Sequence, residues 1–256
     1  MFRPNFLILL ISLWSSAAFG FDHVHTTWSA VLKLYRTVDA RVRYAELKNA
    51  AAGRHDHPFN VYIAEIQQVP KRTFETWTRD EQKAFLLNAY NALTVRLILD
   101  HYPTKSIRDI GGLFQKPWSV EFFSLLGGAA KSLDVIEHEL LRPVYRDYRV
   151  HSAVNCASVS CPELRGEAYV GSRLNEQLDD QMRRWLADTT RNQFDGVAGK
   201  FKISKIFDWY QRDFDSWGGG VKKVLATFAP AGSRSAIQKG GDIQYLDYDW
   251  NLNEAK

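Results

Sequence analysis

TRDEQKAFLLNAYNALTVRLILDH (residues 78–101) is the stretch that decides the fold. Thr78 is followed three residues later by Glu81, which is the Ser/Thr-x-x-Glu form of a capping box at a helix start. The residues that follow are apolar nearly all round, which is typical of a helix buried inside a protein. We therefore predict a central buried helix from about Thr78 to His101, ending before Pro103.

Two asparagines interrupt this apolar helix. Asn88 and Asn91 are three residues apart and so lie on one helix face. Burial obliges each side-chain amide to find hydrogen-bond partners. Either the two amides tie neighbouring loops to the helix, or they orient a functional site.

A second helix is predicted for KSLDVIEHELLRP (residues 131–143), from an N-cap at Ser132 to a stop at Pro143. Spacing of about 100° per residue builds an apolar stripe from Leu133, Ile136, Leu140 and Leu141. Glu137 falls inside that stripe, and His138 lies towards its edge. A buried carboxylate must be paired or protonated. We expect Glu137 either to pair with Arg142, Arg146 or Arg165, or to serve in a site.

YRVHSAVNCASV (residues 148–159) is rich in small and β-branched residues, which favours a short buried strand ending in the turn SCP. A regular strand would place His151, Ala153 and Asn155 on one face and Cys156 on the other. His151 and Cys156 would then not be partners. A turn or helix at Cys156 would remove that objection.

Helical spacing also marks TTWSAVLKLYRTV (26–38) and LNEQLDDQMRRWLAD (174–188). GKFKISKIFDWYQRDF (199–214) indicates a strand running into a helix capped at Ser204. SWGGGVKKVLATFAP (216–230) indicates a glycine-broken connection and a last helix, and IQYLDYDWNLN (243–253) an extended tail. Helices outnumber strands, so we predict an α+β fold: a mostly helical single domain over residues 21–256 with a small β-sheet.

The first twenty residues have the three regions of a secretory signal peptide: Arg3, the apolar run FLILLISLW, and the small residues of SSAAFG. Its removal after Ala18 or Gly20 would remove one charged residue, Arg3, and so lower the net charge from +4 to about +3. No later run is long enough to span a membrane, and no basic cluster indicates nucleic-acid binding. We expect a periplasmic or secreted protein without a membrane span after processing.

The two cysteines, Cys156 and Cys161, admit several roles. In an exported protein they could form a structural disulfide across their short loop. Alternatively, Cys156 is a catalytic thiolate with a nearby base, for which His138, His151, Glu137 and Asn91 are the candidate helpers. A redox pair and inert buried thiols are further alternatives. No structural zinc spacing, phosphate loop or dinucleotide fingerprint occurs, so we predict no metal and no cofactor.

Five segments together resemble the domain-of-unknown-function 547 family: AFLLNAYNALTVRLILDHYPTKSI, SLDVIEHELLR, HSAVNCASVSCPELRGEAY, ISKIFDWYQRDF and YLDYDWNLN. They cover most of residues 80–253 in the family's order. Leu86 departs from the aromatic residue that the family usually has there. The resemblance implies that the asparagine pair, the Glu137–His138 pair and the Asn155–Cys156 to Cys161–Pro162 segment are recurring elements. It implies no activity, because the family has none assigned.

Our first functional hypothesis is an exported cysteine hydrolase or acyl transferase acting on an amide or thioester of a small molecule or peptide. Cys156 would be the nucleophile, His138 the base, and Glu137 the residue that holds its imidazole. Asn88 or Asn91 would donate to the oxyanion, and His151 is the substitute base. The alternative is a non-catalytic envelope protein, structural or binding, with a Cys156–Cys161 disulfide.

Overall fold

The computed structural model describes residues 20–112, 115–128 and 130–255, and its centre is helix α5 (Arg79–His101). The predicted capping box is present: the Thr78 hydroxyl accepts from the Glu81 amide, and the Glu81 carboxylate accepts from the Thr78 amide. Every residue from Ala84 to Leu99 except Arg96 is buried. The prediction of a central buried helix is confirmed.

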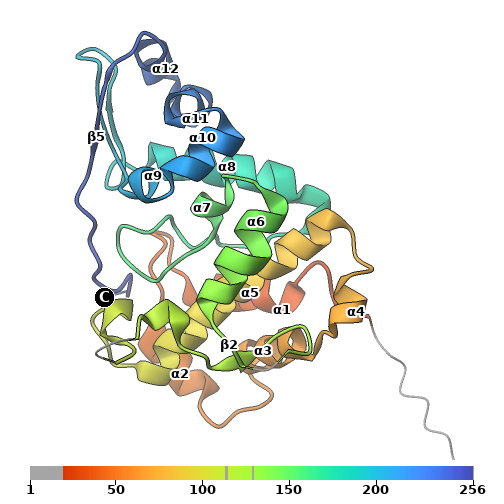
Figure 1. Ribbon diagram of the computed structural model, residues 1–256. Helices are drawn as coiled ribbons and strands as arrows, with labels where there is room; N and C mark the ends of the chain where they lie inside the picture. Colours follow the sequence, from red (N-terminus) through yellow and green to blue (C-terminus); the bar gives the residue numbers. More distant parts are fainter. Residues whose placement is uncertain (1–19, 113–114, 129, 256) are drawn as a thin grey trace, which may run out of the picture.

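The N-terminal helices α1 (Thr26–Tyr35), α2 (Tyr44–Ala51) and α3 (Pro58–Gln68) pack around α5, and the short α4 (Lys71–Phe74) leads into it (Figure 1). After α5 come the 3-10 turns η1 (Ile107–Asp109) and η2 (Pro117–Ser119) and the antiparallel pair β1 (Phe123–Ser124) and β2 (Ala130–Lys131). These elements build one side of the molecule around a single buried helix.

The helix predicted for residues 131–143 is present but widened. Residues Val135–Leu141 form a π-helix, η3, which continues into α6 (Arg142–Tyr145). The Arg142 amide donates to the carbonyl of Glu137, five residues earlier. Single π-helical turns inside helices are frequent at functional sites. Glu137 and His138 both lie in this widened segment.

The C-terminal part contains α8 (Leu174–Ala187), entered through the 3-10 turn η4 (Gly171–Arg173), and the helices α9 (Ile206–Trp209), α10 (Gln211–Gly218) and α11 (Val221–Phe228). A mixed sheet places β4 (Lys200–Ile203) between antiparallel β3 (Gln193–Asp195) and parallel β5 (Asp242–Tyr245). Helix α12 (Ala231–Gln238) was not predicted.

Buried apolar residues gather in two clusters. One surrounds α5 and includes Leu252 near the C-terminus, and the other lies between α8, the mixed sheet and α9–α12. After β5 the chain returns from the second cluster to the first (Figure 1). The mostly helical α+β class is confirmed. The signal peptide predicted for residues 1–20 falls, apart from Gly20, outside the described residues.

Candidate functional site

A cleft of about 1120 Å³ lies between the two core clusters and contains both cysteines. Its walls also include the polar side chains of Glu137, His138, His151, Tyr210 and Tyr248. A smaller cavity of about 460 Å³ against α2 and α3 contains none of the predicted site residues. The cleft is therefore the candidate site.

Cys156 is half-buried in the cleft wall, and three hydrogen-bonding groups surround its sulfur. The Sγ atom lies 2.9 Å from Sγ of Cys161, 3.2 Å from Oγ of Ser158 and 3.3 Å from the Tyr248 hydroxyl. Ser158 also donates to Tyr248 over 3.0 Å. Cys161 is buried, and both cysteines are free thiols, so the predicted structural disulfide is not present. No histidine hydrogen-bonds to Cys156 among the described residues.

These neighbours change the acidity of the two thiols in opposite directions. The hydrogen bond from Cys161, helped by those from Ser158 and Tyr248, outweighs burial and lowers the pKa of Cys156 to about 7. Burial and the adjacent Cys156 sulfur raise the pKa of the Cys161 thiol. A large share of Cys156 is therefore thiolate at neutral pH, whereas Cys161 keeps its proton.

Removing one donor tests this account. Tyr248→Phe should raise the pKa of Cys156 from about 7 to about 8, because a hydrogen bond to a charged group contributes about 1.5–3 kcal/mol and one pKa unit is about 1.4 kcal/mol. The rate of iodoacetamide alkylation against pH measures it. Tyr210→Phe is the matched control, because Tyr210 lines the cleft but its hydroxyl donates to Glu137 and not to the sulfur. Equal profiles for both variants would contradict the prediction.

The loop that carries Cys156 is anchored to α5 by Asn91. The Asn91 amide donates to the carbonyl of Ala153 over 2.9 Å, and its oxygen accepts from the amide of Asn155 over 2.8 Å. Asn155 in turn accepts from the Ala157 amide over 2.9 Å. Ala157 has a φ of 60°, a strained value for alanine. Such strain persists only where the surroundings hold it, and it clusters at active sites.

The strand predicted for residues 148–159 is wrong. Val150–Ala153 form a helical turn, α7, and residues 154–161 form a loop. A short run of small apolar residues does not distinguish a strand from a buried helical turn. The alternating faces predicted for His151 and Cys156 therefore do not exist, and both side chains line the cleft.

The oxyanion role predicted for Asn88 and Asn91 has no support in the geometry, because neither lines the cleft. Asn88 holds the backbone of Tyr169 in the same way as Asn91 holds its loop, with bonds of 2.8 and 2.9 Å to the carbonyl and the amide. Both residues tie loops to the central helix, which is the first of the two roles that the sequence left open.

His151 is buried and paired with Asp213. Its Nε2 lies 2.9 Å from Oδ2 of Asp213, whose pKa is lowered to about 2 by hydrogen bonds from His151 and Arg142 that outweigh burial. An ionised Asp213 only accepts, so Nε2 must carry the proton and Nδ1 a free lone pair. Burial lowers the pKa of His151, and Nδ1, itself buried, has no hydrogen-bond partner among the described residues. The cleft thus contains a neutral imidazole with an unused basic nitrogen.

Glu137 and His138 do not form the predicted hydrogen-bonded dyad, because Oε1 of Glu137 lies 4.0 Å from Nδ1 of His138, beyond hydrogen-bond distance. Glu137 is buried and accepts a 2.7 Å hydrogen bond from Tyr210, whose ring stacks on His151. No arginine lies within ion-pair distance of Glu137 among the described residues, because Arg142 pairs with Asp213 instead. Nδ1 of His138 lies 2.7 Å from Arg142, and Nε2 3.6 Å from Asp134. Nδ1 of His138 therefore accepts from Arg142 and is not free to take a proton, so the geometry favours His151 as the base.

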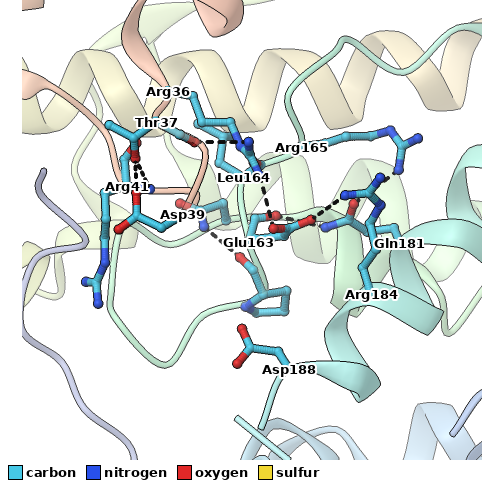
Figure 2. Close-up of polar contacts among 12 residues, drawn as sticks. Arg36, Thr37, Asp39, Arg41, Glu163, Leu164, Arg165, Gln181, Arg184 and Asp188 are labelled. Atoms are coloured by element: carbon cyan, nitrogen blue, oxygen red, sulfur yellow. Dashed lines mark hydrogen bonds and ion pairs between the residues drawn. The ribbon is translucent and has the colours of Figure 1, made fainter. Parts of the chain in front are cut away.

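A polar network supports the chain just after Cys161. Figure 2 shows Arg36 and Arg184 converging on Glu163, at 3.0 and 3.4 Å. Arg36 also donates to the carbonyl of Leu164, and Gln181 to the carbonyl of Glu163. Helix α8 and the segment after α1 thereby fix the outer end of the cysteine loop.

Sequence reasoning missed the groups that complete the site: Ser158, Tyr210, Asp213 and Tyr248. Tyr210 and Asp213 lie in ISKIFDWYQRDF and Tyr248 in YLDYDWNLN, two of the segments that carry the family resemblance. That resemblance was the available signal. Periodicity could not bring Tyr248 to Cys156, because they are 92 residues apart in the chain.

In the part of the chain that the structure describes, no three His, Cys, Asp or Glu side chains are grouped so as to hold a metal ion. Nor does any helix within the described ranges have the length and apolar character needed to cross a membrane.

Fold and site together define a mostly helical α+β protein with a half-buried cysteine in a polar cleft. Residues 74–186 match the protein family described as "Protein of unknown function, DUF547". The chain thus contains a DUF547 region over residues 74–186, where three of the five sequence segments that indicated the family lie. The match spans α5, η3 and the cysteine loop, but not Asp213 or Tyr248. No curated protein and no solved structure matches the chain significantly.

Proposed function

We propose that this protein is a cysteine-dependent acyl transferase or hydrolase, with Cys156 as its nucleophile. The observation that carries the proposal is the sulfur's position in the cleft, with Cys161 and Tyr248 as donors to it and the Ser158 hydroxyl, which donates to Tyr248, beside it. These donors hold a thiolate, which is the reactive form of cysteine. With the predicted signal peptide, the activity would be located in the periplasm or outside the cell.

The electrostatics of the cleft favour a thioester or activated ester as the substrate. His151 is neutral at pH 7 because burial lowers its pKa, and the reactive form of Cys156, about half of it at that pH, has already lost its proton. The pair therefore holds no proton ready for an amine leaving group. A thiolate or an activated alkoxide leaves without one. An amide would need an acid that neither residue supplies.

In the first step the Cys156 thiolate attacks the acyl carbon, and the carbonyl oxygen gains the negative charge. The Tyr248 hydroxyl, which accepts from Ser158, lies beside the sulfur and can donate to that oxyanion. Collapse breaks the bond to the leaving thiolate, which takes its proton from solvent. The product of this step is an acyl group on Cys156.

In the second step the acyl group is transferred to water or another acceptor. Nδ1 of His151 takes the acceptor's proton while the acceptor oxygen attacks the acyl carbon, and the Cys156 thiolate is released. Asp213 stabilises the imidazolium through Nε2, and the proton then passes to solvent. His138 and Glu137 line the cleft without a step in this scheme.

A pre-steady-state assay with 4-nitrophenyl acetate tests the proposal. The wild type should release nitrophenolate in a stoichiometric burst, with an acetyl group on Cys156 by mass spectrometry. Cys156→Ser should abolish the burst, whereas Cys161→Ser should retain most of it, because a serine hydroxyl still donates. A wild type without an acyl adduct, or a burst that survives Cys156→Ser, would refute the nucleophile.

The same assay separates the two histidines. His151→Gln should slow release of the acetyl group by about 100-fold or more, which is the usual contribution of a general base. His138→Gln should change that rate little, since Nδ1 of His138 already accepts a hydrogen bond from Arg142. A larger effect at His138 would restore the base role predicted from the sequence.

A further inference from the structure

The second thiol gives the site a chemistry that acyl transfer does not use. Sγ of Cys161 lies 2.9 Å from Sγ of Cys156 and also accepts from the Cys156 backbone amide over 2.9 Å. The two cysteines are separated by a turn, in which the amide of Cys161 donates to the carbonyl of Ser158. A small movement of one sulfur would bring the pair to bonding distance.

The two thiols differ in access. Both cysteines line the cleft, but Cys161 is only 3% exposed, whereas Cys156 is half-buried. A disulfide entering the cleft therefore meets Cys156 first. Without unfolding of the loop, the Cys161 sulfur can be reached only by the sulfur of Cys156.

The loop between the cysteines is also held by the returning C-terminal segment. The amide of Val159 donates to the carbonyl of Asn251, and the Ser160 amide donates to the carbonyl of Asp249. The amide of Asp249 donates back to the Ser160 hydroxyl over 2.8 Å. The sulfurs are thus kept together by a pinned backbone, which lowers the entropic cost of joining them.

We propose that Cys156 and Cys161 carry out thiol–disulfide exchange, with Cys156 as the attacking thiol and Cys161 as the resolving thiol. The substrate class is a small disulfide that the cleft admits. The proposal needs only the sulfur pair and does not depend on acyl transfer.

The exchange proceeds in two balanced steps. The Cys156 thiolate attacks one sulfur of the incoming disulfide, forming a mixed disulfide and releasing one thiolate. Cys161 then attacks Sγ of Cys156, forming the Cys156–Cys161 bond and releasing the second thiolate, which takes up the proton that Cys161 loses. The incoming disulfide is reduced by two electrons, and the protein pair is oxidised by two. In the oxidised form the acyl-transfer nucleophile is blocked.

Oxidised glutathione is the probe, and intact-mass spectrometry is the measurement. The fully reduced wild type should lose two hydrogens, pass only transiently through a glutathione adduct, and recover its mass with dithiothreitol. Cys161→Ser should stop at a stable glutathione adduct on Cys156. Cys156→Ser, whose remaining thiol is buried, should react far more slowly than the wild type.

Three results would overturn the proposal: a wild-type adduct as stable as that of Cys161→Ser, no reaction of the wild type, or wild-type reactivity in Cys156→Ser. Should Cys161→Ser fail to fold, peptide mapping of the oxidised wild type decides the question, because only resolution yields a peptide linked through Cys156 and Cys161. None of these readouts involves an acyl group. Failure here and failure of the burst assay are therefore separate results.

Discussion

Replacing Asp147 by asparagine should lower the free energy of unfolding by about 3–5 kcal/mol, the usual cost of removing one partner from a buried ion pair. Asp147 lies 2.9 Å from Nζ of Lys83 and 2.9 Å from Nη2 of Arg149. Lys83 belongs to α5 and is only 7% exposed. Without the carboxylate, its ammonium stays buried with no opposite charge. Urea unfolding followed by tryptophan fluorescence measures the loss.

The same residue makes stability depend on pH in acid. Burial alone would raise the pKa of Asp147, but hydrogen bonds from Arg149 and the charge of Lys83 outweigh it and lower the pKa to about 2. An aspartate in the unfolded chain has a pKa of about 3.9. The folded-state pKa is thus depressed, so this stabilisation of about 2 kcal/mol is present above pH 4 and lost as the pH falls to about 2. Asp147→Asn should lack that acid-dependent part.

Asp56→Asn is the matched control, because Asp56 also pairs with an arginine, Arg54, but its side chain is 76% exposed. Its unfolding free energy should stay nearly unchanged. If Asp147→Asn lowered the free energy of unfolding no more than Asp56→Asn does, the prediction would be wrong. Lys83 and Arg149 would then have to become solvated in the variant.

Asn91→Ala should have the second large effect, a loss of about 2–5 kcal/mol together with altered Cys156 chemistry. The substitution leaves the carbonyl of Ala153 and the amide of Asn155 buried without partners, each at a cost of about 1–3 kcal/mol. Asn155 directly precedes Cys156 in the anchored loop. We expect the alkylation profile of Cys156 against pH to move upward, because the sulfur loses its fixed place among its donors.

Asn88→Ala separates stability from site geometry. Asn88 lies one turn earlier on the same helix and makes the same two bonds, to the backbone of Tyr169. Its loss should destabilise the protein by a similar amount and leave the Cys156 profile where it is. If Asn88→Ala and Asn91→Ala shifted the alkylation profile of Cys156 equally, the effect would come from general loosening of the fold rather than from loss of the loop anchor.

The asparagine pair shows how far local pattern reaches. Burial of the central helix and the shared face of Asn88 and Asn91 followed from spacing alone, and both are present. The two amides also had to find partners, and they did so in loops far along the chain. Which loops they hold was not encoded in any spacing.

The cysteine loop marks where local pattern fails. Residues 148–159 were assigned to a strand because small β-branched runs fit one, yet Asn91 holds Ala153 and Asn155 in a turn and loop. The base assignment failed for a related reason. His138 and Glu137 are adjacent in sequence, but Arg142 and Tyr210 engage them separately.

The sequence by itself determined the mostly helical class, the capped central helix and the candidate nucleophile, because caps, apolar periodicity and residue chemistry act over a few neighbouring positions. Only the tertiary structure decided that Tyr248, Ser158 and Cys161 surround Cys156. It also decided that Asp213 holds the proton of His151 on Nε2, which leaves Nδ1 as the basic nitrogen. Those contacts join segments up to 92 residues apart, and their placement depends on how two core clusters pack around one cleft.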